Sequence, residues 1–177
     1  LQILQRKKEN EEIGSNSHVV RNYYIRSLDY FDSHEKEIIE LCNVFNARAM
    51  LRLNKRSFRK IAFKAMVNLA NSISNREYTY CGKAYDKAVG QSSNEDGDSK
   101  RWLIDIDKVD NAYPIPILEL IKIINEIAPT ERKYKVIATI PSKNGVHLIS
   151  TPFNTQEFKH VCPFEVHKDN PTNLYIP

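Results

Sequence analysis

The sequence is poor in the residues and motifs that mark several common protein classes. Its 177 residues include only five glycines and contain neither a GxxxxGK[ST] phosphate loop nor a GxGxxG dinucleotide motif. The GxSxG elbow of serine hydrolases and an HxxxH zinc helix are also missing. No apolar run approaches the roughly 20 residues that span a bilayer, so we expect no membrane partner.

Cysteine is scarce as well. Cys42, Cys81 and Cys162 lie far apart, and no two of them form a CxxC pair. This pattern argues against a disulfide framework and against a structural zinc site. It favours a reducing compartment, and we expect a cytoplasmic protein.

The remaining composition is that of an ordinary globular protein, with 41% hydrophobic and 27% charged residues and a net charge of +4. This length predicts a single domain over 1–177. The polar residues 1–20 are expected to form a flexible arm, and 91–100 (QSSNEDGDSK) a mobile surface loop. The modest positive charge permits a polyanionic partner without requiring one.

Helical and strand-like patterns are interspersed along the chain, which predicts an α+β or mixed α/β domain. Helices are expected in three places. The first runs from Asp32 or Ser33 to about Asn46, the second begins after a cap at Ser57, and the third covers 117–128. Alternating apolar residues predict a strand over 47–53, and Asn144-Gly145 predicts a hairpin between 134–140 and 146–151. A short helix is expected over 155–160 and a strand over 161–167.

The strand predicted at 102–107 (WLIDID) carries two carboxylates. Side chains two apart on a strand share a face, so Asp105 and Asp107 converge. Such a pair suits Mg²⁺ or Mn²⁺, which prefer carboxylate oxygens and leave positions open for phosphates. On spacing alone, a strand end that points both carboxylates into solvent is an equally good interpretation.

The turn at 141–147 (PSKNGVH) brings together three polar side chains. The Ser142 hydroxyl and the Lys143 ammonium group can donate to phosphate oxygens, and a protonated His147 can do the same. His147 follows a glycine, where a backbone can approach a ligand closely. Without the upstream aspartates, an ordinary hairpin with a solvated lysine is the better interpretation.

Two further strands carry paired polar residues. Arg48 and Arg52 share one face of the 47–53 strand and can contact a nucleic-acid backbone or a triphosphate, although salt bridges on an exposed sheet face explain them equally well. Glu165 and His167 share a face near the C-terminus. Because Glu165 lies in an apolar run, its carboxylate needs a partner or a metal.

Taken in their order along the chain, the paired aspartates, the turn at 141–147 and the strand with Glu165 resemble the catalytic core of the archaeo-eukaryotic primase superfamily. This superfamily includes primase-polymerases of phages and other mobile elements. The resemblance covers roughly 101–175. It is carried by Leu103-Ile104-Asp105-Ile106-Asp107, by Ser142-Lys143-Asn144-Gly145-Val146-His147 and by Phe164-Glu165-Val166-His167.

The resemblance implies an RRM-like palm sheet with flanking helices beside a small N-terminal α/β unit. It implies that Asp105, Asp107 and Glu165 are catalytic metal ligands, and that Ser142, Lys143 and His147 bind the nucleotide's phosphates. In the family the third acid is usually Asp, so Glu165 is a departure. The implied partners are nucleoside triphosphates, a DNA or RNA template and a helicase or other replication protein.

Three functions follow as hypotheses. The first is a metal-dependent nucleotidyltransferase of the primase-polymerase type. The second is a non-catalytic nucleic-acid-binding module of the same fold, whose binding would survive loss of the aspartates. The third is a metal-dependent nuclease that uses the same acids.

Overall fold

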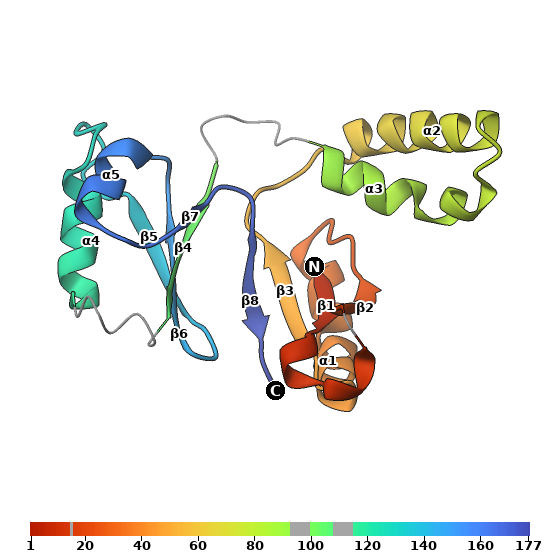
Figure 1. Cartoon of the computed structure of the whole chain (residues 1–177), viewed down its shortest axis with the longest axis horizontal. Coiled ribbons are helices and arrows are strands. Elements are labelled where there is room, and N and C mark those ends of the chain that lie inside the picture. Colours follow the sequence, from red (N-terminus) through yellow and green to blue (C-terminus); the bar gives the residue numbers. More distant parts are fainter. Residues whose placement is uncertain (15, 93–99, 108–114) are drawn as a thin grey trace. The chain divides into compact units, whose positions relative to one another are not determined.

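The computed structural model (Figure 1) describes residues 1–14, 16–92, 100–107 and 115–177. These residues form two compact units, one made of Leu1–Leu53 with Arg101–Pro177 and the other of Asn54–Lys100. The described part contains two four-stranded antiparallel sheets and five α-helices. The predicted mixed α+β class is therefore confirmed.

One sheet of the first unit is built from the second half of the chain. Its strands lie in the order β5-β6-β4-β7, and every neighbouring pair is antiparallel. Along the chain, strands and helices follow one another as β-α-β-β-α-β: β4 (Trp102–Asp107), α4 (Ile117–Glu126), β5 (Val136–Pro141), β6 (Gly145–Ser150), α5 (Thr155–Val161) and β7 (Val166–His167). The first and third strands of this series occupy the centre of the sheet.

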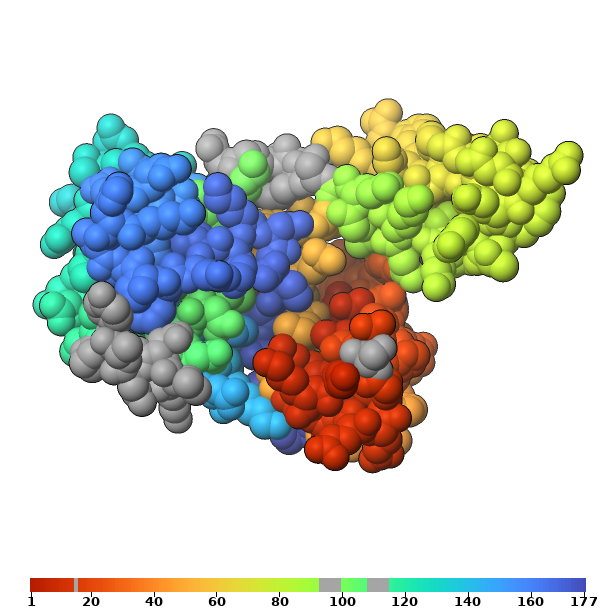
Figure 2. Space-filling view, viewed as in Figure 1, coloured from red at the N-terminus to blue at the C-terminus, as the bar shows by residue number. Residues whose placement is uncertain are grey.

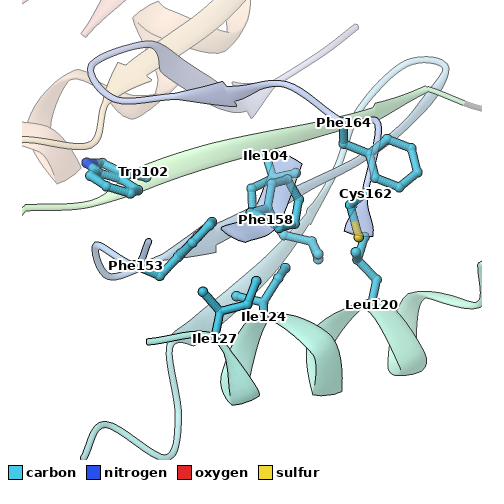
Figure 3. Close-up of a cluster of buried hydrophobic side chains, with 10 residues drawn as sticks. Trp102, Ile104, Leu120, Ile124, Ile127, Phe153, Phe158, Cys162 and Phe164 are labelled. Atoms are coloured by element: carbon cyan, nitrogen blue, oxygen red, sulfur yellow. The ribbon is translucent and has the colours of Figure 1, made fainter. Parts of the chain in front are cut away.

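Helices α4 and α5 cover one face of this sheet, as Figure 1 shows. Alternation along β4 places Ile104 on that face, where it is fully buried with Ile124 of α4 and Phe158 of α5. Figure 3 shows this cluster, in which the Phe153 ring makes edge-on contacts with Trp102 and Phe158. The core therefore fixes which face of β4 turns away from the helices.

The N-terminal residues belong to the second sheet of the same unit, and the expectation of a flexible arm over residues 1–20 is wrong. The sheet has the order β2-β1-β3-β8, with strands β1 (Gln2–Gln5), β2 (His18–Asn22), β3 (Arg48–Arg52) and β8 (Pro171–Tyr175). Ile3 is fully buried beside Cys42 of α1 (Leu28–Val44). Burial of such apolar side chains holds a segment that looks polar as a whole.

Between β1 and β2 the chain forms two short 3₁₀ turns, Lys7–Glu9 and Glu11–Ile13. Asn10 separates them and anchors the segment, because its amide nitrogen donates to the carbonyl oxygens of Arg6 and Asn46. Both bonds are close to 3 Å, at 3.1 and 3.0 Å. These bonds hold the charged residues 6–9 in a defined place.

The second unit is helical. It contains α2 (Phe58–Ser74), a 3₁₀ helix (Tyr78–Lys83) and α3 (Ala84–Gln91). Ser57 caps α2 as predicted, since its hydroxyl accepts from the Lys60 backbone N–H. Most of the loop expected at 91–100 lies outside the described residues. None of the helices in the described ranges combines the length and apolarity needed to cross a membrane.

Candidate functional site

The predicted aspartates lie on the face of β4 that turns away from α4 and α5. In the antiparallel ladder Asp105 lies opposite His147, and Asp107 lies opposite Gly145. Residues directly opposite each other in such a ladder project to the same face. Asp105, Asp107 and His147 therefore share one face, while Ile104 and its partner Leu148 share the other, buried face.

Gly145 lets β6 lie close to β4 within the sheet. A Cβ atom at this position would lie 1.9 Å from the carbonyl oxygen of Ile106, so only glycine lets β6 pair with β4 here. The turn is closed by the Ser142 backbone N–H, which donates to the Gly145 carbonyl at 3.0 Å. This strand-pairing role adds to the expectation that the backbone can approach a ligand closely at this glycine. Its consequence is the position of Ser142, Lys143 and His147.

These residues line one pocket of about 240 Å³ within the first unit. It contains six of the eight side chains that the sequence singled out. The lining residues are Arg6, Lys8, Glu9, Arg48, Asp105, Asp107, Ser142, Lys143, Asn144 and His147. Figure 2 shows the surface of the β5–β6 hairpin next to that of the N-terminal segment, which agrees with the ion pair between Lys143 and Glu9.

Each ring nitrogen of His147 lies close to a polar side chain. Its side chain is 9% exposed, its Nδ1 lies 2.9 Å from the Thr172 hydroxyl of β8, and its Nε2 lies 3.4 Å from Asp105 Oδ1. Burial lowers the pKa of His147 below 6.5 although the charges of Asp105 and Asp107 act to raise it. The ring is therefore neutral near pH 7, and a role that needs a charged imidazole is disfavoured.

Two polar atoms of the pocket residues lack partners. Asp105 Oδ1 and Ser142 Oγ are buried, and neither forms a hydrogen bond within the described part of the chain. The contact of Asp105 with His147 becomes an ion pair only when the ring is protonated, which burial opposes. Buried polar atoms normally have partners, so these two indicate a place where a ligand, an ion or water binds.

Glu9 is the pocket residue that sequence reasoning missed. Its carboxylate accepts two hydrogen bonds from the Arg48 guanidinium, from Nε at 3.0 Å and from a terminal nitrogen, and lies 3.2 Å from Lys143 Nζ. Burial acts to raise the pKa of Glu9, but Arg48 and Lys143 outweigh it and hold the pKa below its usual value. In the sequence, nothing distinguishes Glu9 from the nearby Glu11 and Glu12.

Two predicted site residues do not line the pocket. Arg52 is 43% exposed at its side chain and lies 3.9 Å from Asp169. Glu165 precedes β7, its side chain is 85% exposed, and it lies 3.7 Å from His167 Nε2. In the described ranges, no group of three or more His, Cys, Asp or Glu side chains is arranged to hold a metal ion.

Comparisons with known protein families, with curated proteins and with solved structures find no match to this chain. The resemblance to primase-polymerases therefore depends on the order of the sequence motifs alone.

Proposed function

We propose that the protein is a metal-dependent nucleotidyltransferase of the primase-polymerase type, acting on nucleoside triphosphates and a nucleic-acid template. The observation that carries the proposal is the shared pocket of Asp105, Asp107, Ser142, Lys143 and His147. These residues come from two sequence motifs about forty residues apart. Nucleotidyl transfer requires metal ligands next to side chains that donate hydrogen bonds to phosphate oxygens.

The order of the strands and helices also supports the proposal. A β-α-β-β-α-β series with its first and third strands at the sheet centre is the split β-α-β arrangement. This is the order expected of an RRM-like palm, with helices on one face and the polar residues on the other. A fold of this kind hosts many activities, so the function depends on the residues of the site.

Asp105 and Asp107 fit a divalent cation by their chemistry. Mg²⁺ is commonly bound by one or two carboxylates together with substrate phosphates, so a third acid is not required for binding. Asp105 Oδ1 makes no hydrogen bond in the described part of the chain and can therefore serve as a metal-binding oxygen. When bound, Mg²⁺ or Mn²⁺ would neutralise negative charge on the transferred phosphate groups. Glu165 remains a proposed third ligand without support from its position.

The other side chains supply binding and orientation. The Lys143 side chain is 52% exposed and can reach a phosphate, while the buried Ser142 hydroxyl can donate a hydrogen bond. Arg6 and Lys8 add positive charge at the same pocket. The Thr172 hydroxyl contacts Nδ1 of the neutral His147 ring and orients it, so that Nε2 faces Asp105. In the tautomer that carries the proton on Nε2, the ring can donate a hydrogen bond without carrying charge.

The test is a primer synthesis and extension assay with Mg²⁺ or Mn²⁺ that compares the wild type with Asp105→Asn/Asp107→Asn. We expect the double variant to lose at least about a hundredfold in rate, because bound metal contributes several kcal/mol of transition-state stabilisation. Asp32→Asn is the matched control, since Asp32 is exposed on α1 and outside the pocket. Equal rates for the wild type and the double variant would refute the proposal.

A non-catalytic nucleic-acid-binding module of the same fold is the second candidate. It is favoured by the high exposure of the Glu165 side chain, because a metal ligand is expected to be more buried. It predicts salt-dependent DNA or RNA binding that the double aspartate variant retains, with no nucleotide incorporation by either protein. Degradation of labelled DNA without added nucleotides would instead identify a nuclease.

A further inference from the structure

Glu9 carries an inference that deepens the proposed function and rests on it. We propose that Glu9 is the internal counter-ion of the pocket, and that a polyphosphate ligand must take Lys143 from Glu9 in order to bind. Glu9 would then set the affinity of the site for phosphate groups. It acts through Lys143 and is a positioning residue.

The two cations that contact Glu9 are held very differently. Arg48 is 7% exposed and makes two hydrogen bonds to the carboxylate, which is itself 11% exposed. Separating a buried, doubly bonded pair leaves an uncompensated charge and is strongly unfavourable. Arg48 is therefore bound to Glu9 whether or not a ligand is present, and it is a poor candidate for binding nucleic acid.

Lys143 makes a weaker contact. One ion pair of 3.2 Å joins it to Glu9, and its side chain is 52% exposed. Partly solvated pairs of this type contribute little to stability, so a phosphate group can replace the carboxylate at low cost. Lys143 also belongs to the turn that brings Ser142 to the same pocket.

A carboxylate at this place opposes an anionic ligand in two ways. It occupies the lysine that the ligand needs, and its own negative charge repels the phosphates across a partly buried space. Asp105 and Asp107 add to this repulsion in the absence of a cation. The pocket thus binds polyphosphate only when Lys143 turns to the ligand, and Glu9 limits how tightly it does so.

The experiment measures binding of inorganic tripolyphosphate with saturating Mg²⁺ by calorimetry. For Glu9→Gln we expect an affinity at least about fivefold higher than for the wild type, because the competing charge is gone while a hydrogen-bonding side chain remains for Arg48. Glu11→Gln is the matched control, since Glu11 is exposed on the neighbouring turn and is not among the residues that line this pocket. Unchanged or weaker binding by a folded Glu9→Gln variant overturns the proposal.

A second variant keeps the test decisive if Glu9→Gln does not fold. Lys143→Gln alters a half-exposed side chain and should lower the affinity several-fold. Where Glu9→Gln folds, it should raise the affinity less in the Lys143→Gln background than in the wild type, because only the direct charge repulsion is then relieved. An unchanged affinity in Lys143→Gln contradicts the exchange. Loss of primer extension in the aspartate variant with no effect of Glu9→Gln on tripolyphosphate binding refutes this inference alone. The reverse pattern refutes the polymerase function alone.

Discussion

The two faces of β4 are built from alternate residues of one six-residue strand, and beyond the buried Leu103 they differ in character, apolar on one face and acidic on the other. Trp102 and Ile104 are buried among the side chains of α4 and α5. Asp105 and Asp107 line a polar pocket on the opposite face. A shift of one residue in pairing would exchange the two sets, so the buried face fixes the position of the carboxylates.

This difference separates stability from function along the strand. Apolar side chains on the helix-covered face supply the burial that holds the sheet and its helices together. The carboxylates contribute little to that core, and one of them has an unpartnered buried oxygen that costs stability. Neighbouring residues should therefore respond to substitution in different measurements.

The largest expected effect on stability is that of Ile104→Ala. Ile104 is fully buried, and removing its side chain leaves a cavity among α4 and α5. We expect the free energy of unfolding to fall by about 2 to 5 kcal/mol in urea titrations. The adjacent Asp105→Asn should change it by less than about 1 kcal/mol. Equal losses in the two variants would break the distinction between the faces.

A smaller effect is expected at His147, whose pKa is lowered by burial. Above pH 6.5, the ordinary pKa of histidine, the ring is neutral in the folded and the unfolded chain, and the full stability is present. As the pH falls below 6.5, the unfolded chain binds a proton more readily than the folded chain, so stability is lost. The free energy of unfolding, measured in EDTA, should therefore decline more steeply with falling pH in the wild type than in His147→Gln. Parallel curves would show that Asp105 compensates for burial.

Much of this arrangement follows from local pattern. The alternation in WLIDID predicts both faces of β4, the Asn-Gly pair predicts the hairpin, and Ser57 predicts the start of α2. Such signals lie within a few residues of the chain and need no knowledge of distant partners. The sequence also suggested that the two aspartates act together with Ser142, Lys143 and His147, and the structure places all five in one pocket.

What the sequence could not predict depends on long-range packing. Glu9 meets Lys143 only because β1 pairs with β3 and thereby places the N-terminal turn at the pocket. The same pairing buries Ile3 and turns an expected flexible arm into a strand. Arg48 and Arg52 look equivalent by alternation, yet Arg48 is buried against Glu9 and Arg52 is half-exposed beside Asp169.

In the proposed function, Asp105 and Asp107 together hold a divalent cation beside bound phosphates. The most direct test is a crystal structure with Mn²⁺ and a non-hydrolysable nucleoside triphosphate, using anomalous scattering to locate the metal. We expect a Mn²⁺ peak bound by both carboxylates, with phosphate oxygens within hydrogen-bond distance of Lys143 and Ser142. A nucleotide bound elsewhere, or a metal that contacts neither aspartate, would refute this role of the two carboxylates.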